Sequence, residues 1–123
     1  MEDRFKFRVW DKVSKRYFFL ELKFGDNGYH PLFIEKPIFE QCTGLKDKNS
    51  KLIYEGDIVR CGKTGQFVYK VSFNKRFASF VLIRKEDTSN HYFGEAVEAE
   101  DVEVIGNIHE NPDLLEVVDV AED

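Results

Sequence analysis

Residues 42–59 read CTGLKDKNSKLIYEGDIV, a segment in which turn-forming residues separate short apolar runs. Residues 40–45 are predicted to form a strand that enters a turn at 47–50, after which the chain pairs back. In a second turn, Gly56 supplies a backbone conformation that side chains disfavour, and Asp57 accepts a local hydrogen bond before the next strand. The segment is rich in residues that shape the backbone, and it contains neither a nucleophile with its base nor a metal-ligand set.

The composition indicates one soluble domain. The chain has 123 residues, of which 42% are hydrophobic and 33% charged, a size that allows a single core. No apolar run approaches the roughly 20 residues that span a bilayer, so no membrane contact is expected. The start lacks the apolar region of a signal peptide, and Cys42 and Cys61 are too few for a disulfide framework. We therefore expect a cytoplasmic protein with two free thiols.

The fold class is predicted to be mainly β, or α+β at most. Aromatic residues make up 15% of the chain and favour strands. An N-terminal β-hairpin arm is predicted to precede the central segment. A short C-terminal helix is predicted to follow it, with Asn111 as N-cap and Pro112 as first helical residue. The predicted strands cover residues 4–10, 17–24, 40–45, 51–54, 67–73, 77–83, 91–93 and 102–108, with another starting at 58.

Charge is distributed unevenly along the chain. Residues 1–85 hold all 18 Lys and Arg residues and have a balance of +8, whereas residues 86–123 have a balance of −13, which gives the net charge of −5. Such asymmetry can indicate a basic binding surface with an acidic tail. The simpler reading, which we favour, is that the acidic segment folds beside the basic strands and neutralises them.

Three segments carry residues typical of one family. They contain Phe7, Arg8, Trp10 and Asp11; then Thr43, Gly44, Leu45, Asp47, Tyr54, Glu55, Gly56, Asp57 and Ile58; and finally Val104, Ile105, Gly106, Asn107, Ile108, Asn111, Pro112 and Leu115. On these residues the chain resembles the YopX-like family, small proteins found mostly in bacteriophages and prophages. Ser50 departs from the pattern, because the family's turn usually has Gly there.

The resemblance implies a phage-encoded or prophage-encoded cytoplasmic protein, mainly β, with a small SH3-like barrel and no known activity or cofactor. Residues 56–59 also look like the start of the first strand of many SH3-like barrels, which is an analogy of fold alone. We expect one domain over residues 1–116, divisible into an arm (1–39) and a barrel (40–110), and an acidic tail (117–123). The structural signature residues are Gly44, Asp47, Tyr54, Gly56, Asp57, Gly106, Asn111 and Pro112.

No residue pattern indicates an enzyme, a metal site or a cofactor. The Cys and His spacings match no familiar zinc arrangement, and Cys42 is more typical of a core residue than of a nucleophile. Glu55 and Asp57 could act as acid and base, but a role in the turn is favoured. Arg8 and Trp10 share a strand face, which is either a stacking platform for bases or the covered side of a sheet. We favour the covered sheet.

Two functions remain from the sequence. The favoured one is a non-catalytic protein-interaction module that contacts a host or phage protein, or a second copy of the chain, through aromatic strand faces. The alternative is an accessory protein that binds nucleic acid through basic hairpin loops, with the acidic end tempering its affinity. The candidate interaction surface comprises Arg8, Trp10, Lys46, Lys48, Lys51 and Arg60, and the nucleic-acid alternative adds Lys63, Lys75 and Arg76.

Overall fold

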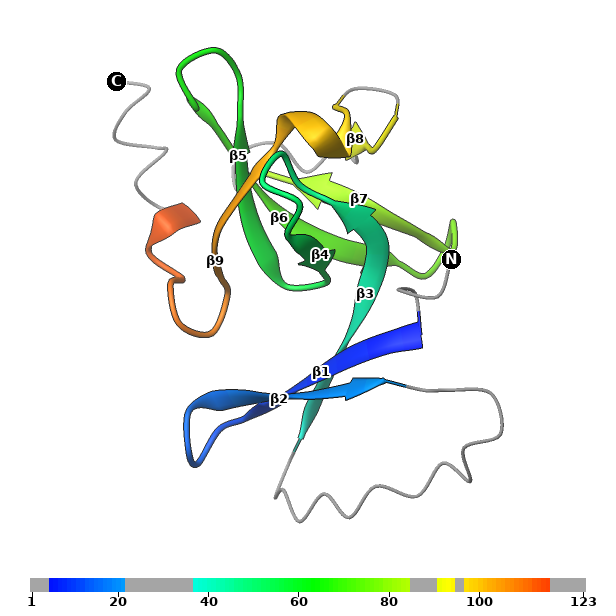
Figure 1. The fold of residues 1–123 in the computed structure, drawn as a ribbon, viewed down its shortest axis with the longest axis vertical. Coiled ribbons are helices and arrows are strands. Elements are labelled where there is room, and N and C mark those ends of the chain that lie inside the picture. The colour runs from blue at the N-terminus through cyan, green and yellow to red at the C-terminus, as the bar shows by residue number, and fades with distance from the viewer. Residues whose placement is uncertain (1–4, 22–36, 85–90, 95–96, 116–123) are drawn as a thin grey trace.

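The structure, a computed structural model, describes residues 5–21, 37–84, 91–94 and 97–115. These residues include nine strands and a short 3-10 helix, η2 (Figure 1). The elements are β1 (Lys6–Asp11), β2 (Arg16–Glu21), β3 (Ile38–Lys46), β4 (Leu52–Tyr54), β5 (Asp57–Cys61), β6 (Phe67–Asn74), β7 (Ser79–Ile83), β8 (His91–Tyr92), η2 (Ala99–Asp101) and β9 (Glu103–Asn107). The mainly β class is therefore confirmed.

Two antiparallel sheets make up the fold. The first has the strand order β2-β1-β3-β4, and the second has the order β8-β7-β6-β5-β9. In Figure 1 the long strand β3 rises from the β1–β2 hairpin at the bottom of the view toward the second sheet. Its first half pairs with β1 and its second half pairs with β4, with an irregularity between Cys42 and Lys46. Gly44 lies in this irregular part with a positive φ of 85°.

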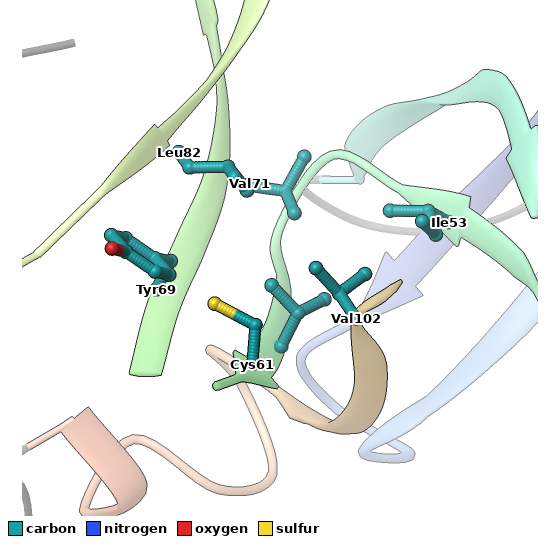
Figure 2. Close-up of a cluster of buried hydrophobic side chains, with 7 residues drawn as sticks. Ile53, Cys61, Tyr69, Val71, Leu82 and Val102 are labelled. Atoms are coloured by element: carbon teal, nitrogen blue, oxygen red, sulfur yellow. The ribbon is translucent and has the colours of Figure 1, made fainter. Parts of the chain in front are cut away.

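The main core lies on the inner face of the second sheet. Figure 2 shows that side chains from β5, β6 and β7 converge there with Ile53 of β4 and Val102, which precedes β9. Strand β7 is buried on both faces, since Val81 and Leu82 are 1% and 0% exposed, as its two apolar faces predicted. The cluster comprises Ile53, Val59, Cys61, Tyr69, Val71, Leu82 and Val102.

The β3–β4 turn is fixed by one buried carboxylate. Asp47 Oδ1 accepts hydrogen bonds from the N–H groups of Asn49 and Lys51, both at 2.9 Å, and Oδ2 accepts one from Val104 of β9, also at 2.9 Å. The turn is thereby tied to a strand 57 residues away. Ser50 adopts a φ of 66° in this turn, a conformation that glycine reaches without steric strain.

The second turn, between β4 and β5, brings the two sheets together. Asp57 Oδ2 accepts a hydrogen bond from the N–H of Tyr54 at 2.8 Å. Gly56 has a φ of 89°, donates its N–H to Val71 and accepts one from Ile108. A side chain at this position would meet Glu40, because an added Cβ would lie 2.4 Å from Glu40 Oε2.

The predicted C-terminal helix starting at Asn111 and Pro112 is not confirmed by the residues that the structure describes. Pro112 and Asp113 form a turn, in which Leu114 donates to Asn111 and Leu115 to Pro112. Leu114 and Leu115 are helical, and the residues after them lie outside the described part of the chain. The Asn111 side chain does not cap a helix: its Oδ1 accepts a hydrogen bond from the N–H of Asn107 at 3.2 Å. It also occupies the space beside Gly106, where an added Cβ would lie 2.5 Å from Asn111 Oδ1.

Other sequence predictions need only small adjustments. The β6–β7 connection covers residues 75–78, so β7 begins two residues later than predicted. The predicted end of the second strand (22–24) and the acidic tail (117–123) lie outside the described residues. Among the described residues, no helix is long and apolar enough to cross a membrane.

We predict that Asp47→Ala will lower the free energy of unfolding by about 2–4 kcal/mol, because three N–H groups lose a partially or fully buried acceptor. Burial raises the pKa of Asp47, but the N–H groups of Val104, Lys51 and Asn49 outweigh it, and the net shift is downward. The ionised Asp47 therefore stabilises the fold fully at any pH above the pKa that it has in the unfolded chain. This stabilisation is lost as the pH falls through the lower pKa that Asp47 has in the folded protein. Urea unfolding of wild type and of Asp47→Asn at pH 7 and pH 3 would measure this. If the free energy of unfolding fell by the same amount in both proteins between pH 7 and pH 3, the pH prediction would be contradicted.

We predict that Gly56→Ala will lower the free energy of unfolding by about 3 kcal/mol or more. Alanine is strained in the left-handed backbone conformation of this position, and its methyl group would also displace the buried Glu40 carboxylate. Gly94→Ala is the matched control, since Gly94 also has a positive φ but has open space where the Cβ would lie. The control should lose only about 1–2 kcal/mol. Similar urea midpoints for the two variants would show that Glu40 accommodates the new methyl group.

Candidate functional site

A buried arginine lies where the two sheets meet. Arg8 on β1 is 6% exposed. Its Nε donates to Glu40 Oε1 of β3 at 2.8 Å, and its Nη1 lies 2.8 Å from Asp57 Oδ1 of β5. Nη2 donates to the carbonyl oxygen of Glu55 at 3.1 Å. One guanidinium group thus connects three strands through charge-assisted hydrogen bonds.

Aromatic rings enclose this guanidinium on two sides. Its central carbon lies 4.2 Å from the ring centre of Tyr17 and 4.8 Å from that of Tyr54. Such contacts between a cation and the face of a ring are stabilising, more so when solvent is excluded. Tyr17 also donates its hydroxyl to Glu40 Oε1 at 3.0 Å, so it contacts both members of the Arg8–Glu40 pair.

Glu40 extends the cluster to the C-terminal part of the chain. His109 Nε2 lies 3.0 Å from Glu40 Oε2, and the His109 ring stacks on Trp10 with centres 4.8 Å apart and an angle of 7° between planes. We call Arg8, Trp10, Tyr17, Glu40, Asp57 and His109 the ionic cluster. Its members come from both sheets and from the turn that follows β9.

Burial shifts the titration of several groups here. Burial alone would lower the pKa of Arg8, but Asp57 and Glu40 outweigh it and raise that pKa. Burial raises the pKa of Tyr17 well above its ordinary value, and it raises the pKa of Asp57 despite the opposing charge of Arg8. The guanidinium therefore stays charged, and the tyrosine hydroxyl stays protonated, throughout the physiological range.

An open groove with a volume of about 570 Å³ lies beside the ionic cluster. Its walls come from β1, β2, β4, β9 and the β3–β4 turn. Phe19, 66% exposed, lines it together with the edge-on ring of Tyr54, 6.0 Å away. The lining residues are Lys6, Arg8, Tyr17, Phe19, Lys46, Ser50, Lys51, Leu52, Tyr54, Asp57, Val104, Gly106, Asn107 and Glu110.

Positive charge predominates at the groove. Lys46 and Lys51 are exposed on its rim, and within the described ranges neither forms an ion pair. Asp57 is engaged by Arg8, and the Glu110 carboxylate accepts a hydrogen bond from Asn107 Nδ2 at 2.8 Å. The groove therefore presents ammonium groups next to aromatic rings, a combination suited to an anionic ligand with a flat or apolar part.

The structure separates the six residues of the predicted interaction surface. Arg8 and Trp10, each 6% exposed, lie on the covered side of a sheet, as favoured from the sequence. Lys46 and Lys51 line the groove. Lys48 and Arg60 lie elsewhere, beside Glu103, with their nitrogens 4.0 and 2.7 Å from its Oε1. Here the acidic third of the chain does neutralise basic residues, through the pairing of β5 with β9.

Several residues of the site could not be assigned from the sequence. Glu40 was predicted only as part of a strand, and Tyr17 and Phe19 only as part of a hairpin. His109 was considered only as a metal ligand. A signal for Glu40 exists in retrospect, because a carboxylate in a largely apolar strand requires a partner when it is buried.

Burial disfavours nucleophilic chemistry at the two cysteines, and the described residues contain no metal-ligand cluster. Both cysteines are buried thiols that form no disulfide, and burial raises the pKa of Cys61, which disfavours the reactive thiolate. No group of three or more His, Cys, Asp or Glu residues within this part of the chain could hold a metal ion. Glu55, whose pKa is raised by burial, accepts a long 3.4 Å hydrogen bond from the N–H of Gln41.

Two antiparallel sheets joined at a buried ionic cluster define a small, mainly β protein with an open cationic groove. The chain belongs to the YopX protein family, which it matches over residues 21–116. It is also similar to the crystal structure of protein EF1440 from Enterococcus faecalis, with a TM-score of 0.56 and 26% sequence identity over 89% of this chain and 96% of that one. The sequence has no significant match among curated proteins.

We predict that Arg8→Met will lower the free energy of unfolding by about 3–5 kcal/mol, because it leaves Glu40 and Asp57 buried without their countercharge. The triple variant Arg8→Met, Glu40→Gln, Asp57→Asn should recover part of this loss. Arg60→Met, which removes the exposed pair with Glu103, is the control and should leave stability almost unchanged. Urea unfolding would compare the variants. Equally small losses of unfolding free energy for Arg8→Met and Arg60→Met would contradict the conclusion that Arg8 holds the three strands together.

Proposed function

We propose that the protein is a non-catalytic interaction module whose groove binds an acidic segment of a partner protein. The observation that carries this proposal is the combination of Lys46 and Lys51 on the rim with the Phe19 and Tyr54 rings inside. The groove volume of about 570 Å³ fits a few side chains of a bound peptide. An acidic segment with one aromatic or aliphatic residue would satisfy both the charge and the rings.

The rigidity of the groove supports the same proposal. Tyr54 is 8% exposed and packs against the Arg8 guanidinium, while Asp57 holds the adjoining turn. A wall held by a buried ionic cluster does not need to be ordered when a ligand binds, and this lowers the entropic penalty of association. The cluster thus serves the groove as a support, because its own charges are already paired.

We also propose that the second sheet is an SH3-like barrel. In support, β5, β6, β7 and β8 form a meander in chain order, and β5 pairs on its other side with β9. The short helix η2 lies directly before β9, and the sheet curls around one core (Figure 1). In this proposal the β1–β2 hairpin is an addition to the barrel, and the groove lies between the two.

Binding of a labelled peptide can test the groove. The probe is a fluorescein-labelled peptide with four glutamates around one phenylalanine, measured by fluorescence anisotropy at low salt, beside a peptide of the same length with glutamine in place of glutamate. We predict that Lys46→Glu with Lys51→Glu will weaken binding by about tenfold or more, since each reversal replaces an attraction by a repulsion.

The matched control is Lys12→Glu with Lys15→Glu, which reverses two exposed lysines in the β1–β2 turn, outside the groove lining. This control should bind the acidic peptide with an affinity within about twofold to threefold of wild type. The proposal fails if the glutamine peptide binds equally well, or if both double variants weaken binding to the same extent.

A further inference from the structure

The tip of the β6–β7 hairpin combines exposed cations with an exposed aromatic ring. Residues 75–78 connect the strands and expose two cations and one aromatic ring, Lys75, Arg76 and Phe77. Phe77 is 55% exposed, and the Arg76 guanidinium carbon lies 5.5 Å from its ring centre. Arginine thus contacts part of the ring, and much of the remainder faces solvent.

The backbone holds this tip in one conformation. Asn74 Oδ1 accepts hydrogen bonds from the N–H groups of Arg76 at 3.0 Å and Phe77 at 3.2 Å. Ala78 closes the turn with a φ of 49°. Directly behind the tip, the Phe73 and Phe80 rings pack edge to face at 5.2 Å. The exposed ring and its cations are therefore presented by a firm hairpin.

Positive charge predominates in the part of the sequence that contains the tip. Residues 58–85 contain seven Lys and Arg residues and no Asp or Glu. In the ranges that the structure describes, neither Lys75 nor Arg76 has an ion-pair partner, whereas Arg60 in the same stretch is paired with Glu103. The net charge of −5 for the whole chain thus conceals a stretch of sequence with the opposite sign.

We propose that this hairpin tip contacts single-stranded nucleic acid, with one base stacked on Phe77 and neighbouring phosphates bound by Lys75 and Arg76. This is a second interaction surface, on different residues from the groove, and goes beyond the proposed function. Stacking needs only a ring face and nearby cations. A protein hot spot needs a surrounding rim that excludes water, and a projecting hairpin tip offers no such rim.

The probe for this surface is a fluorescein-labelled 20-nucleotide oligothymidylate, with anisotropy measured between 20 and 200 mM salt. Wild type should bind at low salt, and affinity should fall as salt rises. Phe77→Ala should weaken binding by about tenfold, the loss of one stacked base. Lys75→Ala with Arg76→Ala should reduce the slope of log affinity against log salt by about 0.7 per cation removed. Thermal unfolding of each variant would confirm that the fold is intact.

Two matched variants separate this surface from the rest of the protein. Lys75→Glu with Arg76→Glu should abolish binding of the oligonucleotide, while Lys12→Glu with Lys15→Glu, at the tip of the other hairpin, should leave it nearly unchanged. The groove variant Lys46→Glu with Lys51→Glu should weaken binding of the acidic peptide without abolishing binding of the oligonucleotide.

Four results would overturn the assignment to the hairpin tip. The first is that wild type does not bind the oligonucleotide at 20 mM salt, and the second is that folded Phe77→Ala binds it with wild-type affinity. The third is that charge reversal weakens binding equally at the two hairpin tips. The fourth is that a duplex of the same length binds as tightly as the single strand.

Discussion

The fold depends on keeping one guanidinium charged while it is removed from water. A buried charge is tolerated only when its partners are close and well placed, and Arg8 meets this condition through Glu40 on β3 and Asp57 on β5. Both sheets must therefore meet at one point. The turn at Gly56 follows from the same requirement, because the chain must pass close to the Glu40 carboxylate with no side chain between them.

The two proposed binding surfaces consist of basic residues that have no ion-pair partner among the described residues, in contrast to those beside β9. Glu103 on β9 faces Arg60 on β5, so basic residues along that pair are neutralised. Lys46 and Lys51 by the groove have no ion-pair partner within the described residues, and the same holds for the cations of the β6–β7 tip. A chain that is acidic overall can in this way carry two separate cationic surfaces, each next to exposed aromatic rings.

Much of the fold follows from local sequence patterns, whereas most of the site does not. The Asp47 and Gly56 turns and the alternating strands are encoded within a few residues, so they could be predicted. A covered face was favoured for Arg8, but its burial as a charge depends on Glu40, which lies 32 residues away, and no local pattern reveals this partner. The N-cap role predicted for Asn111 was wrong for a related reason: Asn111 has the chemistry of an N-cap, but its side chain accepts a hydrogen bond from the N–H of Asn107, which precedes it in the chain.

The contact between His109 and Glu40 joins residues 69 positions apart in the chain, and β9 pairs with β5 although β6, β7 and β8 lie between them in the sequence. Contacts of this range form late and slow the folding reaction. On the ribosome, the strands up to β7 emerge before the residues that complete the ionic cluster. A nascent chain halted before β9 lacks His109, so Glu40 lacks this partner and Trp10 lacks the ring that stacks on it. Such an intermediate would expose aromatic surface and be open to aggregation or to capture by chaperones.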